Sequence, residues 1–298
     1  MAAPTISVAL VTRNRPDSLE RTLASLRRQQ RAPFEVLVSD DSDDALARRT
    51  RSVARAFDCT YVRGPQRGLY ANRNAVALRC SGTHIRSMDD DHEFPPGHWE
   101  RCEEAVARDP EAVWIIGEVI PSIPGMSPDE CPGELHPRGF SVPPRDPDDT
   151  WAIADGASIY PAHLFRSGIR FAERFRFGAS YLEFGSRLHR LGYRIRYLPG
   201  THVVHHADFA NRSFSDAPED IAARVFATLS HSFRYQPTFS NKALTLSQIG
   251  LDVVRAGRSG VGAVHDGFRA YRAQRMELGP LDGPAPPRAS RAAGLHAA

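Results

Sequence analysis

The sequence is poor in cysteine, which argues against two classes of protein. Only four cysteines occur among 298 residues, at positions 59, 80, 102 and 131, and no two of them form a CxxC pair. A disulfide-rich secreted fold and a structural zinc site both depend on cysteines at characteristic spacings. We therefore expect reduced, mostly buried thiols.

Long hydrophobic runs are also absent. No stretch approaches the roughly 20 apolar residues that a membrane-spanning helix needs. The N-terminal MAAPTISVALVTRNRP has no basic region ahead of its apolar residues, so it is not typical of a signal peptide. We expect a cytoplasmic protein and leave peripheral contact with a membrane open.

The net charge is small, only +3 at neutral pH, and does not indicate a nucleic-acid partner. A hydrophobic fraction of 41% and a charged fraction of 24% are ordinary for a soluble globular protein. The charge is unevenly placed, however, because acidic residues cluster at 40–44 and 89–93. These two clusters are the first candidates for a functional site.

Short apolar, β-branched segments alternate with segments of helical periodicity over the first 120 residues. Helix signals include Pro16 at a helix start, followed by leucines at helical spacing. The alternation predicts an α/β protein with a mostly parallel twisted sheet flanked by helices. The expected strands are 5–12, 34–41, 59–64, 83–88 and 112–120.

This alternation ends after residue 120. Residues 121–150 are rich in Pro, Gly and Asp and predict a long loop, which we interpret as a lid or gate over a binding site. From about residue 216 the pattern is helical and predicts a C-terminal helical extension. The last residues, 280–298, are typical of a disordered tail.

Acidic and polar residues stand where the expected strands end. Thr12, Asp41 and the run 89–91 all lie at carboxyl ends, the edge at which open α/β sheets bind ligands. Asp89 and Asp91 are two residues apart and can share one hard divalent cation such as Mg²⁺ or Mn²⁺. The alternative is a solvated acidic turn ahead of a helix that begins near Pro95.

Several motifs together resemble one known family. ISVALVTRNRPDSLERTLASL, FEVLVSDDSDD and RGLYANRNAVALRCSGTHIRSMDDD, in this order, resemble the nucleotide-sugar half of family 2 glycosyltransferases, which have the GT-A fold. SRLHRL followed by GYRIRYLPGTHVVHH is similar to the closing segment of the family. The resemblance covers about residues 5–210.

The resemblance implies a division of the chain into parts. Residues 1–210 would form the GT-A glycosyltransferase domain, with 1–120 binding the nucleotide sugar and 121–210 the acceptor. Residues 211–279 would then be the helical extension and 280–298 the tail.

It also implies roles for individual residues. Thr12 and Asp41 would hold the nucleobase, and Arg73 would contact the diphosphate. The metal, Mn²⁺ or Mg²⁺, would be bound by Asp89, Asp91 and a histidine. Of the adjacent His205 and His206 we choose His205, because neighbouring residues of a strand point in opposite directions. The full set expected to bind the donor is Thr12, Arg13, Asp41, Arg73, Asp89 and Asp90.

The sequence departs from the family at the catalytic base. Inverting members place an acidic pair at the start of the helix, ahead of an RL motif, but here Ser180 and Tyr181 stand at those positions. Three explanations stay open: Glu183 is the base, Asp155 is the base, or the chain uses another mechanism or is not catalytic. For Glu183 the alternative is a surface ion pair with Arg187.

The resemblance therefore implies a metal-dependent glycosyltransferase of the hexosyltransferase type. It would transfer a sugar from a nucleoside diphosphate sugar, with UDP as the expected nucleotide and inversion as the expected outcome, to a hydroxyl acceptor that is a glycan, a lipid or a small molecule. The competing hypothesis is a non-catalytic nucleotide-sugar or glycan-binding protein that lacks the base. Formation of a homodimer stays open.

Overall fold

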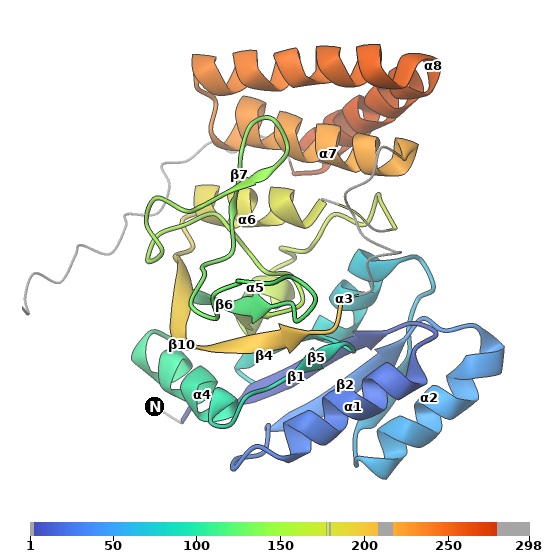
Figure 1. The fold of residues 1–298 in the computed structure, drawn as a ribbon, viewed down its shortest axis with the longest axis vertical. Helices are drawn as coiled ribbons and strands as arrows, with labels where there is room; N and C mark the ends of the chain where they lie inside the picture. Colours follow the sequence, from blue (N-terminus) through green and yellow to red (C-terminus); the bar gives the residue numbers. More distant parts are fainter. Residues whose placement is uncertain (1–2, 177, 179, 208–216, 279–298) are drawn as a thin grey trace, which may run out of the picture.

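The computed structural model describes residues 3–176, 178, 180–207 and 217–278. A large curved sheet with helices on both faces forms one end of the molecule, and two C-terminal helices, α7 and α8, form the opposite end (Figure 1).

The main sheet has eight strands in the order β3-β2-β1-β4-β9-β6-β10-β5. The first four are parallel, as predicted, whereas β9 lies antiparallel between β4 and β6, and β5 pairs antiparallel with the end of β10. The second half of the sheet is therefore mixed. The strands are β1 (Ile6–Thr12), β2 (Glu35–Asp40), β3 (Thr60–Arg63), β4 (His84–Asp89), β5 (His92–Glu93), β6 (Val113–Val119), β9 (Ser158–Pro161) and β10 (Ile195–His205).

Two helical layers cover the two faces of the sheet. Helices α1, α2 and α4 contribute to one hydrophobic core, and α3, α5 and α6 contribute to the other. Alternation along β1 explains the two cores, because Val8 and Leu10 enter the first while Ala9 and Val11 enter the second. The helices are α1 (Pro16–Arg27), α2 (Asp44–Ala56), α3 (Leu69–Ala77), α4 (His98–Arg108), α5 (Ala162–Arg166) and α6 (Ser180–Arg190).

The three consecutive aspartates form the junction between two strands. Asp89 is the last residue of β4, Asp90 and Asp91 form a turn, and β5 begins at His92. Because β5 runs across to pair with β10, the turn brings the acidic run beside His205, the end of β10. Contact between these segments, more than 100 residues apart, is a property of the sheet order.

The segment 121–150 is a loop that carries a small hairpin of its own. Strands β7 (Glu134–Leu135) and β8 (Ser141–Val142) pair antiparallel, apart from the main sheet. The periodicity of the sequence does not show these strands because each has only two residues.

The predicted helical extension is present, and its first helix begins at residue 218. Helix α7 (Pro218–Ser230) continues into a π-helical turn, η2 (His231–Tyr235), and α8 (Phe239–Leu278) follows. Helix α8 is kinked at Gly257, whose φ of 57° lies in the left-handed region, so it consists of two helical segments joined at a glycine. No helix in the described ranges is both long enough and apolar enough to cross a membrane. The predicted tail, 280–298, lies outside the described residues.

Candidate active site

A cavity of about 1160 Å³ opens at the carboxyl ends of β1, β2 and β4. Of the ten residues that the sequence singled out, eight line this cavity, and Asp90 and Glu183 do not. The register of the strands explains the grouping, since Thr12 pairs with Asp40 on one side and Val11 with Asp89 on the other. The eight are Thr12, Arg13, Asp41, Arg73, Asp89, Asp91, Asp155 and His205.

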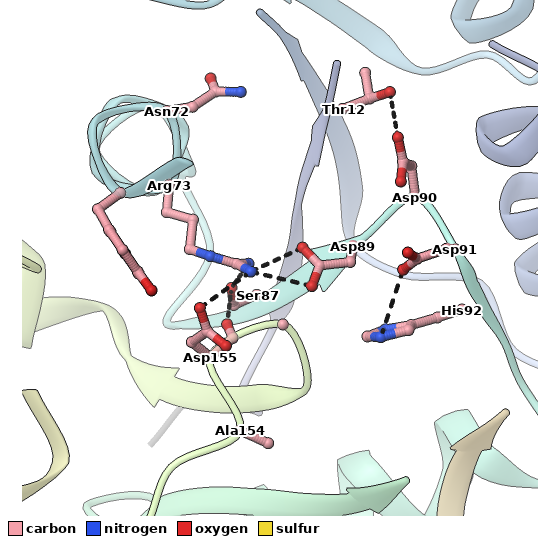
Figure 2. Close-up of polar contacts among 12 residues, drawn as sticks. Thr12, Asn72, Arg73, Ser87, Asp89, Asp90, Asp91, His92, Ala154 and Asp155 are labelled. Carbon is pink, nitrogen blue, oxygen red and sulfur yellow. Dashed lines mark hydrogen bonds and ion pairs between the residues drawn. The ribbon is translucent and has the colours of Figure 1, made fainter. Parts of the chain in front are cut away.

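The three neighbouring aspartates have different nearest partners, since Asp89 extends toward Arg73, Asp90 toward Thr12 and Asp91 toward His92 (Figure 2). Asp89 is bound by Arg73, Asp90 accepts a hydrogen bond from Thr12 at 2.5 Å, and Asp91 lies near histidines. This arrangement compensates the repulsion that three adjacent carboxylates would otherwise suffer.

Arg73 links the acidic turn to the loop before β9. Its guanidinium donates to both carboxylate oxygens of Asp89, at 2.8 and 3.1 Å, and to Ser87 Oγ at 3.0 Å, and it lies 3.3 Å from the Asp155 carboxylate (Figure 2). Burial by itself lowers the pKa of Arg73, but Asp89 and Asp155 outweigh it and raise that pKa. With only 2% of its side chain exposed, Arg73 holds these two carboxylates in place, whereas the sequence had it contacting the diphosphate.

Asp90 is fully buried and supports the turn from inside. Its backbone oxygen accepts a hydrogen bond from the Thr22 hydroxyl at 2.7 Å, and Arg15 lies 2.5 Å from its carboxylate. Burial raises its pKa to about 7 in spite of the Arg15 charge. This places Asp90 beneath the cavity, where it orients Thr12 and the turn, and not on the donor-binding surface that the sequence predicted.

Asp91, His92 and His205 form a candidate metal centre. One ligand atom from each lies within 4.8 Å of the others. Among the described residues, Asp91 Oδ1 is buried and has no hydrogen-bond partner, and His92 Nε2 lies 3.9 Å from it, so this oxygen is available to bind a cation. Carboxylate oxygen and imidazole nitrogen are common ligands of divalent transition ions. The residues present thus fit a divalent cation, with His92 rather than Asp89 as the third ligand.

The charged groups around this cluster shift one another's pKa values. Burial alone would lower the pKa of His205, but Asp91 and Glu118 raise it to about 10. Glu118, on β6, lies 2.5 Å from His205 Nδ1. Burial opposes ionisation of Asp91, but the neighbouring histidines and Arg15 lower its pKa below the usual range.

Sequence reasoning missed three residues of this centre, namely Arg15, His92 and Glu118. Arg15 forms ion pairs with Asp90 and Asp91, at 2.5 and 2.8 Å. A signal existed for two of them, because Arg15 lies in the loop after β1 and Glu118 is the penultimate residue of β6, both near the carboxyl ends of strands. His206, next to His205 in the sequence, instead contacts Glu93 at 2.6 Å, so of these two histidines it is His205 that lies in the cluster.

The other end of the cavity contains the second acidic cluster. Asp41 follows β2, accepts a hydrogen bond from the Gln66 N–H at 2.9 Å and has a pKa raised by burial. Arg13 is exposed and lines the same cavity. Gly68 closes this side; its φ is 109°, and a Cβ there would lie 2.5 Å from the Arg176 Cα. Only glycine fits at this close approach.

The two candidate bases have different environments. Glu183 is fully buried, accepts a hydrogen bond from Tyr235 at 2.5 Å and lies 3.1 Å from Arg187. Its pair with Arg187 is therefore internal and not on the helix surface, and the structure does not bring Glu183 to the cavity. Asp155 lines the cavity, and 19% of its side chain is exposed.

Comparison with known proteins agrees with the family resemblance. Residues 7–131 match the model of glycosyl transferase family 2. Over 101 residues the chain is 30% identical to an uncharacterized glycosyltransferase, YwdF, of Bacillus subtilis (strain 168). That alignment covers 34% of this chain and 38% of YwdF, so the chain matches well under half of this relative.

Solved structures confirm the GT-A fold. A crystal structure of GalNAc-T7 with UDP, GalNAc and Mn²⁺ superposes with a TM-score of 0.62 at 15% identity, over 83% of this chain and 54% of that one. Residues 1–349 of S. aureus TarS, in complex with UDP-GlcNAc, give a TM-score of 0.57 at 14% identity, over 93% of this chain and 92% of that one. At these identities the likeness concerns the fold.

Proposed function

We propose that the chain, whose residues 7–131 belong to glycosyl transferase family 2, transfers a sugar from a nucleoside diphosphate sugar to a hydroxyl acceptor. The observation that carries this proposal is the single cavity that contains both acidic clusters, Asp41 at one and Asp91 at the other. A nucleotide sugar has a base and a diphosphate at two separate positions, and the two clusters match that layout. UDP is the proposed nucleotide because the GT-A neighbours were crystallised with UDP or UDP-GlcNAc.

Asp91, His92 and His205 would hold a divalent cation, with Mn²⁺ or Mg²⁺ as the candidates. When bound, such an ion neutralises charge on the departing diphosphate. Arg13 and Arg15 are exposed and line the cavity, so their guanidinium groups are candidates for contact with phosphate oxygens. Arg73 keeps Asp89 and Asp155 fixed and has little surface left for the donor.

Asp155 is the proposed base. It would take the proton from the acceptor hydroxyl while that oxygen forms a bond to the anomeric carbon, and the bond from this carbon to the diphosphate breaks. Attack from the face opposite the diphosphate inverts the configuration. Two features support the choice of Asp155 over Glu183, its place on the cavity wall and its residual exposure.

The segment 121–150 supplies part of the proposed acceptor side. Met126, Glu130 and Cys131 line the cavity from this segment, and Tyr181 lines it from α6. A loop in this position can close over a bound acceptor and exclude water.

Release of UDP tests the proposal. The protein is incubated with UDP-GlcNAc or UDP-GalNAc, Mn²⁺ and a panel of hydroxyl acceptors, and free UDP is measured for the wild type, Asp155→Asn and the exposed control Asp17→Asn. We expect UDP release that Asp155→Asn reduces at least about 100-fold and Asp17→Asn leaves unchanged.

A different result would support the competing hypothesis. If donors raise the melting temperature but no acceptor gives UDP release, the chain binds nucleotide sugars without transferring them. If no nucleotide sugar changes the melting temperature in the presence of Mn²⁺, the proposed donor site is wrong.

A further inference from the structure

We infer that the first half of α8, residues 239–256, is a docking surface for an anionic membrane. This segment forms the outermost layer of the helical end of the molecule and is drawn in orange in Figure 1. Its inner side is anchored on the protein, since Thr245 and Asp252 are buried and Ile249 packs on the core of α7 and α8. The outer side faces away from the sheet and from the cavity.

The outer side is apolar over five turns. Phe239, Leu246 and Val254 have exposed fractions of 89%, 56% and 80%. Their spacings of seven and eight residues place them along one side of the helix. Leu251 is 43% exposed beside them, and Ala243 and Gly250 fill the positions between.

Two exposed serines, Ser240 and Ser247, also lie on this side. Ser247 donates its hydroxyl to the Leu244 backbone oxygen at 2.8 Å, so the helix itself satisfies this group. A largely apolar side of this length on a monomer surface marks an interaction site.

The charges that border the apolar side are all positive. Lys242 and Arg255 lie on its two edges, and Arg258 follows directly after the kink. Asp252 is the one acidic residue in the stretch 239–258, all of which the structure describes. It is buried, lies 3.6 Å from Arg224 and accepts a hydrogen bond from Gln248 at 3.0 Å. The exposed side therefore offers cations and apolar groups and no carboxylate.

This charge pattern separates an anionic membrane from a second copy of the chain. Two copies meeting through this side would bring Lys242, Arg255 and Arg258 close to their own equivalents, and no carboxylate on the side could pair with them. Anionic lipid headgroups supply the missing charge, while Phe239 and Val254 enter the boundary between headgroups and acyl chains. Long basic side chains at the edge of an apolar helix side suit this arrangement because their heads extend to the headgroups.

Vesicle flotation tests the inference with the full chain. Vesicles of phosphatidylcholine alone are compared with vesicles that contain phosphatidylcholine and phosphatidylglycerol at about three to one. The variants are the double substitution Phe239→Ser with Val254→Ser, and Arg255→Glu. The matched controls are Phe34→Ser, at another exposed phenylalanine (56% exposed), and Arg48→Glu, at an exposed arginine on α2.

We expect the wild type and both controls to float with the anionic vesicles and not with the neutral ones, and the binding to weaken with added salt. Arg255→Glu should lower the affinity about fivefold or more, and the double variant at least about tenfold. Circular dichroism and melting temperature should stay unchanged in both, because the altered side chains are exposed.

Two results would overturn the inference. One is an absence of flotation with anionic vesicles, or flotation that the double variant retains. The other is a wild-type dimer in solution that the double variant converts to a monomer without any vesicle binding, which would make this side a contact between copies of the chain. Neither result bears on UDP release, so the proposed transfer activity is tested separately.

Discussion

Replacing Glu183 by glutamine should destabilise the fold much more than it slows sugar transfer. The Glu183 carboxylate is fully buried between Tyr235 and Arg187, at 2.5 and 3.1 Å. The substitution leaves the buried Arg187 guanidinium without its counter-charge, and removing one partner of a buried pair costs about 3–5 kcal/mol. Glutamine retains a carbonyl oxygen that accepts from Tyr235, so we expect the lower end, about 3 kcal/mol.

This free energy translates into a measurable shift. For a chain of 298 residues, with an unfolding entropy of about 2.1 cal/mol/K per residue, about 3 kcal/mol lowers the melting temperature by roughly 5 °C. Tyr235→Phe, which removes only the hydroxyl, should cost about 1.5–3 kcal/mol, because that hydroxyl donates to a charged group. In a double-mutant cycle the two substitutions should be non-additive, since both act on one network.

The matched control is Glu104→Gln, at a carboxylate that pairs with Arg101 at 3.1 Å on the exposed face of α4. An exposed pair contributes about 0–1 kcal/mol, so the control should melt within about 2 °C of the wild type. UDP release at a temperature well below the transition should stay within about twofold for Glu183→Gln, because Glu183 does not line the cavity. A Glu183→Gln protein that melts like the wild type but has lost UDP release would refute the reasoning and restore Glu183 as the base.

Three further predictions concern other parts of the molecule. Asp155→Asn should reduce UDP release at least about 100-fold while a donor with Mn²⁺ still raises the melting temperature; loss of both would indicate a disturbed cavity. His205→Ala should abolish the extra thermal stabilisation that Mn²⁺ gives to the UDP complex, and a variant that retains it would remove His205 from the metal centre. His231 is buried against Ser186, at 2.6 Å, and burial lowers its pKa from 6.5 to about 4. The unfolded chain therefore binds this proton first, so stability should fall by up to about 3 kcal/mol as the pH drops from 6.5 to 4, and His231→Gln should flatten that part of the curve of melting temperature against pH.

The local pattern of the sequence was enough to predict the nucleotide half of the fold. The strands that become β1, β2, β3, β4 and β6 are each recognisable within a few residues, because a buried strand in an α/β sheet is a short apolar run between helices. Parallel strands place their carboxyl ends at one edge, so Thr12, Asp41 and the acidic run were expected together, and Thr12, Asp41, Asp89 and Asp91 do line one cavity, whereas Asp90 does not. Roles that depend on which way a side chain points were predicted less well.

The neighbours of each aspartate show this difference. Asp89 and Asp91 look equivalent in the sequence, but Arg73 binds Asp89, whereas Asp91 lies beside His92 and His205. The separation arises because the chain turns at Asp90 and continues as β5, which pairs with β10. The two-residue strand β5 is too short to be recognised from its sequence.

The sequence alone thus determined the α/β architecture, the sheet edge at which the site lies and the family resemblance of residues 7–131, since these depend on residues close together in the chain. Only the tertiary structure decided which carboxylate faces the cavity. Glu183 is enclosed by Tyr235, 52 residues further on, in the helical extension, whereas Asp155 is held at the cavity wall by Arg73 from α3. Which side chains are buried and which charges pair between such distant segments depends on how the layers pack, and this cannot be predicted from a local sequence pattern.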